Sequence, residues 1–163
     1  MIDSYTIALF TAILLQAMLR ATIAVEHRIA VVCGSLRQPG PFQLQAAIAA
    51  LHAQAPSAED TDWIQITALY TALLPTWPSP SARIAHAVAI GMADGPDAGL
   101  ALLDHLAVDH GNARLLAGRG HLLERAGRFD EATIAFEAAA GSAQHLREAE
   151  CLRRRARDAA TRH

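Results

Sequence analysis

The sequence lacks lysine, and all fourteen of its basic residues are arginines. Charged residues make up only 18% of the 163 residues and aromatic residues 5%, whereas hydrophobic residues reach 52%. A chain so poor in charge and so rich in apolar side chains is not expected to be disordered. Its formal net charge of -2 gives no electrostatic reason to expect direct binding to nucleic acid or to an anionic membrane.

Cysteine is also scarce, since only Cys33 and Cys151 occur and they form neither a CxxC pair nor a disulfide framework. The simplest interpretation is a reduced, cytoplasmic chain in which both thiols are small buried apolar groups. Eight histidines raise the question of a metal site, but neither HExxH nor CxxC occurs. We therefore expect no metal and no cofactor.

One long apolar run, Ile7–Leu19, lies near the N-terminus. It is shorter than the roughly 20 residues that cross a bilayer, and it lacks the basic start and cleavage site of a signal peptide. We expect no membrane span and interpret the run as a buried or interface helix, with an edge strand or a membrane contact as alternatives. Because a small core cannot cover such a segment, we expect it to form a homodimer with a second copy.

Proline and glycine divide the rest of the chain into segments with helical periodicity. The breaks between these segments lie at Gly40-Pro41, Pro56–Asp60, Pro75–Pro80, Asp94–Pro96, Gly127 and Gly141. Connections this short predict antiparallel neighbouring helices. The predicted fold class is therefore all-α.

Two stretches in the second half resemble each other. They read ADGPDAGLALLDHL from Ala93 and RAGRFDEATIAFEAAA from Arg125. A helix–turn–helix unit with a period of about 34 residues resembles the tetratricopeptide repeat. The resemblance implies a right-handed array of stacked helix pairs, about seven to eight helices in all, in which neighbours share one core. We assign two repeats, to Pro80–Leu106 and Asn112–Ala139.

A longer pattern begins at Pro39 and reads PGPFQLQAAIAALHAQAPSAEDTDWIQITALY. Together with the two repeats, it resembles the C-terminal tetratricopeptide-like extension of a group of bacterial extracytoplasmic-function sigma factors, from about Arg20 to Arg155. The DNA- and polymerase-binding regions of a sigma factor would precede this module, so we do not expect a complete sigma factor. Two features depart from the family: the apolar run before Arg20, and Ala85-His86 where the family has Asn-Arg.

These patterns predict one helical domain over residues 1–163, in four parts. Residues 1–38 form apolar N-terminal helices, 39–78 the family-signature helix pair, 79–141 the two repeats, and 142–163 a basic capping helix. Within the signature, Asp62 is expected to stabilise a helix N-terminus and Trp63 to anchor the core.

Equivalent positions on the first helices of stacked repeats face one concave groove. His86 and His121 lie about one repeat apart and are taken as such positions. Polar groups that only satisfy the structure are the alternative interpretation. No nucleophile, base and orienting group form a legible set, so no catalytic residue is assigned. The predicted groove residues are Gln45, His52, His86, Arg119 and His121.

The sequence thus favours a non-enzymatic binding or regulatory module that recognises a protein partner or a small hydrophobic ligand. The alternative is a stand-alone enzyme of specialised metabolism, which folds or cyclises a hydrophobic intermediate with hydrogen bonds from His and Gln. A closed apolar cavity that touches His52, His86 or His121 would favour the enzyme, and an open groove the binding module.

Overall fold

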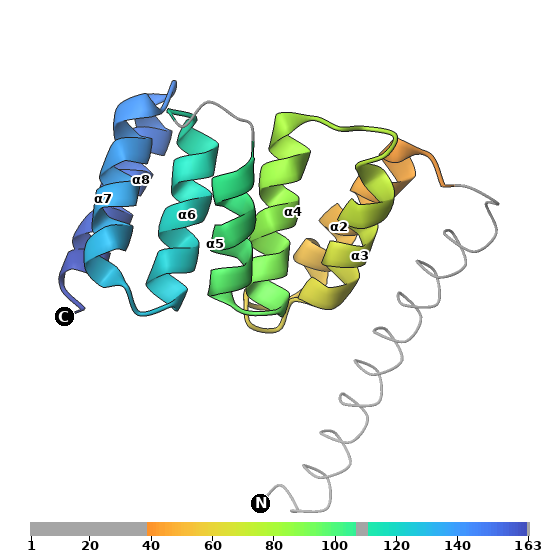
Figure 1. The fold of residues 1–163 in the computed structure, drawn as a ribbon, viewed down its shortest axis with the longest axis horizontal. Coiled ribbons are helices and arrows are strands. Elements are labelled where there is room, and N and C mark those ends of the chain that lie inside the picture. The colour runs from red at the N-terminus through yellow and green to blue at the C-terminus, as the bar shows by residue number, and fades with distance from the viewer. Residues whose placement is uncertain (1–38, 107–110, 163) are drawn as a thin grey trace, which may run out of the picture. The chain divides into compact units, whose positions relative to one another are not determined.

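The structure is a computed structural model that describes residues 39–106 and 111–162. Every regular element in these two ranges is an α-helix, and consecutive helices lie side by side (Figure 1). The all-α array of helix pairs is therefore confirmed. The helices are α2 (Pro41–Gln54), α3 (Trp63–Leu73), α4 (Pro80–Ala93), α5 (Pro96–His105), α6 (Ala113–Arg125), α7 (Phe129–Ser142) and α8 (Leu146–Ala160). The predictions for residues 1–38, including the dimer segment Ile7–Leu19 and Cys33, lie outside the described residues.

The helices alternate between two roles, and we call α2, α4, α6 and α8 the first helices and α3, α5 and α7 the second helices. From α3 onward, the residue that caps each helix recurs at one constant interval in both series, and we call this interval the period. The period is the separation of Asp62 from Gly95, which is slightly shorter than the predicted repeat length. The regular spacing of the caps extends beyond the two assigned repeats, to α3 and α8. The caps are Asp62, Gly95 and Arg128 for the second helices and Ser79, Asn112 and His145 for first helices α4, α6 and α8.

Several of these caps supply the hydrogen bonds that a helix N-terminus needs. The Asp62 carboxylate accepts a bond of 2.9 Å from the backbone N–H of Gln65, which confirms its predicted role. The Ser79 hydroxyl accepts one of 3.1 Å from Ala82 in the same way. At the other end of a helix, Gly127 follows α6 with a φ of 72°, a conformation that side chains other than glycine rarely adopt.

The core is built from large apolar side chains and from glycines where helices approach closely. A Cβ atom on Gly99 of α5 would lie 2.7 Å from the Cα of Gly91 on α4, so no larger residue fits without separating these helices. On α6, Gly120 makes similar room for the ring of Phe136. The largest fully buried side chains are Phe136, Ile66, Leu73, Ile84, Leu103, Leu122 and Leu123.

Trp63 is half-buried rather than enclosed in this core. Its indole N–H donates a hydrogen bond of 2.7 Å to the carbonyl of Ala58. The hydroxyl of the buried Thr61 donates one of 3.0 Å to the carbonyl of Ser57. Trp63 and Thr61 thus hold the connector between α2 and α3 in place, which fixes where α3 begins.

The last helix, α8, buries one apolar face and exposes arginines on the other. Ala87 of α4 and Gly120 of α6 lie one period apart, and both adjoin the second helix of their own pair. The residue one period later is Arg153, which is exposed. The outer face of α8 is therefore polar at the position where Ala87 and Gly120 adjoin a second helix, and the capping role stays a prediction. On the same helix, Cys151 is exposed, so the expectation of a buried thiol was wrong.

Candidate functional site

An open groove of ≈ 490 Å³ lies along the first helices, and we call it the first-helix groove. Its floor is apolar and includes the buried side chains of Ile48, Leu73 and Ala82. Polar side chains surround this floor. Its lining consists of Gln45, Ile48, Ala49 and His52 from α2, Tyr70 and Leu73 from α3, Ser79, Ser81, Ala82 and Ala85 from the start of α4, and Arg114 from α6.

Gln45 and His52 therefore line the same groove. They are separated by about two helical turns, which places them on one face of α2. The imidazole of His52 also packs edge-on against the ring of Trp63, with 5.3 Å between the centroids. This contact orients His52 at the end of the groove nearest the α2–α3 connector.

Arg114 and Tyr70 also line the first-helix groove, although the sequence interpretation did not name them. Arg114 is exposed, and no carboxylate of the described residues forms an ion pair with it. Burial raises the pKa of the Tyr70 phenol, and the nearby charge of Arg114 opposes that rise. Tyr70 therefore stays protonated at neutral pH. Both residues present hydrogen-bond donors to the groove.

The period could have identified Arg114. Ser81 is the second residue of α4, and Arg114 is the second residue of α6, one period later. Both also line a neighbouring polar groove of ≈ 590 Å³, which continues to α8. This polar groove is lined by Ser81, Gly111, Asn112, Ala113, Arg114, Ser142, Gln144, His145 and Glu148.

His86 lies in a different groove, of ≈ 460 Å³, which is bordered by α3, α4 and α5. Its Nε2 is 3.2 Å from the hydroxyl of Thr71, which itself donates to the carbonyl of Thr67. The imidazole is therefore the donor in this contact. Burial lowers the pKa of His86 and so favours its neutral form.

Arg119 is the repeat equivalent of His86. It lies one period after His86 and forms an ion pair with Asp104, which lies one period after Thr71. The contact between Thr71 and His86 thus joins α3 to α4, and the ion pair between Asp104 and Arg119 joins α5 to α6 at the equivalent place. Both polar groups satisfy partners within the array, and neither lines the first-helix groove.

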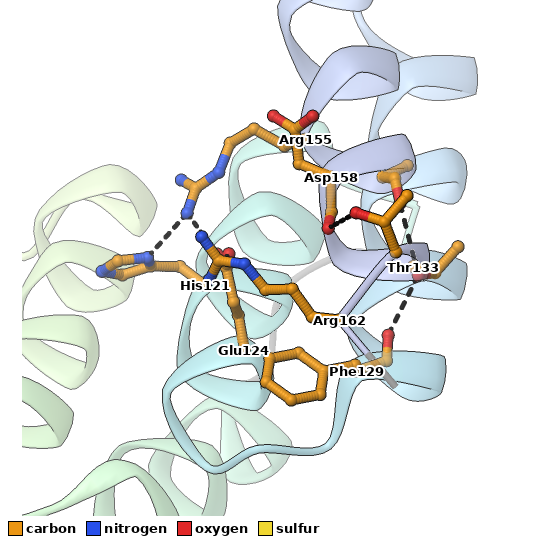
Figure 2. Close-up of polar contacts among 9 residues, drawn as sticks. His121, Glu124, Phe129, Thr133, Arg155, Asp158 and Arg162 are labelled. Carbon is orange, nitrogen blue, oxygen red and sulfur yellow. Dashed lines mark hydrogen bonds and ion pairs between the residues drawn. The ribbon is translucent and has the colours of Figure 1, made fainter.

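His121 belongs to a third location, the contact of α6 with α8 (Figure 2). Arg155 donates hydrogen bonds of 3.1 Å to Nδ1 of His121 and of 2.5 Å to the carboxylate of Glu124. Arg162 donates one of 3.0 Å to the other oxygen of Glu124. The guanidinium of Arg155 also lies 4.8 Å from the centre of the Phe136 ring. This network fastens the C-terminal helix to the array.

The His121 contact predicts a loss of stability in acid. Burial, then the charge of Arg155, lowers the pKa of His121 below its ordinary value of 6.5, whereas Glu124 acts in the opposite direction. A depressed pKa means that the stabilising contribution is complete above pH 6.5 and is lost as pH falls through the folded-state pKa. Protonation would remove the acceptor at Nδ1 and place a second cation beside Arg155.

Urea unfolding at neutral and mildly acidic pH measures this effect. We expect His121→Gln to lose less stability on acidification than the wild type, while His86→Gln reports the separate contribution of that histidine. Equal pH dependence of His121→Gln and the wild type would contradict the assignment.

The described residues hold no group of three or more His, Cys, Asp or Glu side chains placed to bind a metal ion. Within the same ranges, no helix has the length and apolar character to cross a membrane. The segment Ile7–Leu19 lies outside these ranges.

Comparisons with known proteins add one relative. The chain is 44% identical over 118 residues to an uncharacterized protein from Rhizobium meliloti. The match covers 72% of this chain but only 28% of the relative, so the chain spans less than a third of that protein's length. No protein-family model and no solved structure matches the chain.

Proposed function

We propose that the chain is a non-enzymatic, tetratricopeptide-like module that binds a protein partner or a small ligand in the first-helix groove. The groove itself carries this proposal. It combines an apolar floor, formed in part by Ile48 and Leu73, with a few polar groups, among them Tyr70 and Arg114. That combination of apolar area and placed donors is typical of ligand sites.

The shape of the groove favours binding over catalysis. The enzyme alternative requires a closed apolar cavity that touches a histidine and excludes water. His52 instead lines an open groove, where it is exposed. His86 and His121 are already engaged by Thr71 and Arg155. Nothing in the described residues therefore favours the enzyme alternative.

We further propose a regulatory role related to that of the sigma-factor extension. Two observations support it. The helices follow one another as consecutive packed pairs, and their caps repeat with one period from α3 to α8. The relative from Rhizobium meliloti is much longer than the match, which leaves room for other regions beside such a module. In this proposal the module acts by binding a partner through its groove.

Filling the groove tests the binding proposal. Ala85 of α4 is half-buried and lines the groove, so Ala85→Leu places added side-chain volume where a ligand would lie. We expect peptides selected from a random display library on the wild type to bind Ala85→Leu at least roughly fivefold more weakly, because a penalty of more than about 1 kcal/mol follows from overpacking. Thermal-shift screening of small molecules against the same pair covers that class of ligand.

Ala101→Leu is the matched control, since Ala101 is an exposed alanine on α5 outside the lining of the groove. It should bind as the wild type does, and circular dichroism should show both variants folded. Selected ligands that bind Ala85→Leu and the wild type equally would refute the proposed site.

A further inference from the structure

The charge of the first-helix groove indicates the chemistry of its ligand. Resting on the proposed function, we propose that the groove takes an extended acidic segment of a protein partner, in which one carboxylate pairs with Arg114. A guanidinium binds a carboxylate with two parallel hydrogen bonds, which gives direction as well as affinity.

The lining of the first-helix groove is complementary in charge to an acidic ligand. Among the residues that line the first-helix groove, Arg114 is the one with a permanent charge, and no Asp or Glu lines it. The guanidinium has no carboxylate partner in residues 39–106 or 111–162. By contrast, Arg119, further along α6, is already paired with Asp104. Arg114 thus offers an ion pair to a ligand.

The neighbouring donors extend the same preference. The Tyr70 phenol, the Ser81 hydroxyl and the Gln45 amide each offer a hydrogen to an oxygen acceptor. His52 adds an imidazole to the same lining. Glu148, on α8, is the acidic side chain in the adjoining polar groove, and it limits how far an acidic ligand extends in that direction.

The shape of the two adjoining grooves suits an extended ligand. The first-helix groove and the polar groove share Ser81 and Arg114, so the two hollows meet at these residues. Together they pass from α2, over α4 and α6, to α8. An extended peptide presents successive side chains to opposite sides. It can therefore place an apolar side chain on Ile48 and Leu73 and a carboxylate on Arg114, and then continue past Ser81 into the polar groove, which a compact ligand does not reach.

The test compares peptide selections on two variants and the wild type. Arg114→Gln removes the charge but keeps a long polar side chain, and Arg153→Gln removes an exposed arginine from the outer face of α8. We expect random peptides selected on the wild type and on Arg153→Gln to be enriched in Asp and Glu next to apolar residues. That enrichment should disappear on Arg114→Gln. Individual acidic peptides should bind Arg114→Gln up to roughly fivefold more weakly, as expected for the loss of a solvent-exposed ion pair.

The outcomes separate this inference from the proposed function. Selected peptides that lose affinity for Ala85→Leu but show no acidic enrichment, or no dependence on Arg114, would overturn the inference and leave the groove as the site. Peptides that are insensitive to Ala85→Leu would overturn both. Added sodium chloride should weaken the acidic peptides, because the ion pair is exposed to solvent and screened. Affinity that is independent of salt would also count against the ion pair.

Discussion

Replacing Phe136 by alanine is expected to lower the free energy of unfolding by about 3–5 kcal/mol, the usual cost of removing a buried aromatic ring. The ring is 0% exposed on α7, and it packs against the backbone of Gly120 on α6. Arg155 of α8 lies over its face. One substitution therefore weakens the contacts of three consecutive helices at once.

Urea unfolding followed by circular dichroism measures the change. Ile134→Ala is the control, because Ile134 lies on the same helix but is 67% exposed, and its truncation should change stability by no more than about 0.5 kcal/mol. Similar losses for the two variants would contradict the packing of α6, α7 and α8 described here. A further expectation is that Arg155→Gln has a smaller effect in Phe136→Ala than in the wild type, because the ring contact is already gone.

Replacing Gly99 by alanine is expected to destabilise the chain by up to about 2 kcal/mol, although alanine is the better helix former by about 1 kcal/mol. A Cβ atom at this position would lie 2.7 Å from both the carbonyl oxygen of Ala87 and the Cα of Gly91. These are backbone atoms of α4, so they yield only if the two helices move apart. Overpacking of this kind costs about 1–3 kcal/mol, which exceeds the gain in helix propensity.

Gly141→Ala should change the stability of the same chain in the opposite direction. Gly141 lies near the end of α7, and nothing stands within 4 Å of its added Cβ. We expect no loss of stability and a gain of up to about 1 kcal/mol. Thermal melting of the two variants side by side measures this contrast. Stabilisation by Gly99→Ala would show that α4 and α5 do not approach as closely as described.

The helices were predictable because their boundaries depend on local chemistry. Prolines at Pro80 and Pro96, and Gly127 with its positive φ, start or stop helices whatever the rest of the chain does. Asp62 caps α3 through its own side chain for the same reason. Such signals need no knowledge of which helices pack together.

The site was only partly predictable because it depends on register. From the sequence, His86 and His121 were taken as equivalent positions in successive repeats. In the structure the equivalent of His86 is Arg119, which lies one period later and two positions before His121. A shift of two positions turns a side chain by about 200° around a helix. His121 therefore points to Arg155 on α8, away from the side that Arg119 occupies.

Arg114 and Tyr70 required tertiary structure. They belong to α6 and α3 and come together only when the helices between them pack. Tyr70 stands in an apolar helix, where the sequence pattern indicates a core residue. Gln45 and His52 lie on one helix, and their position on one face of it follows from their spacing in the sequence.

The two sides of the array differ in how their polar groups are used. Where a second helix meets the next first helix, His86 and Arg119 are engaged by partners in the array. Along the first-helix groove, Arg114 has no such partner in the described residues. This difference is the physical basis for assigning recognition to the first-helix groove.

The most direct test of this assignment is a crystal structure of the chain with an acidic peptide selected as above. We expect an extended peptide across α2, α4 and α6, with a carboxylate on Arg114 and an apolar side chain over Ile48 and Leu73. A peptide bound instead in the groove beside His86, or on the outer face of α8, would contradict it.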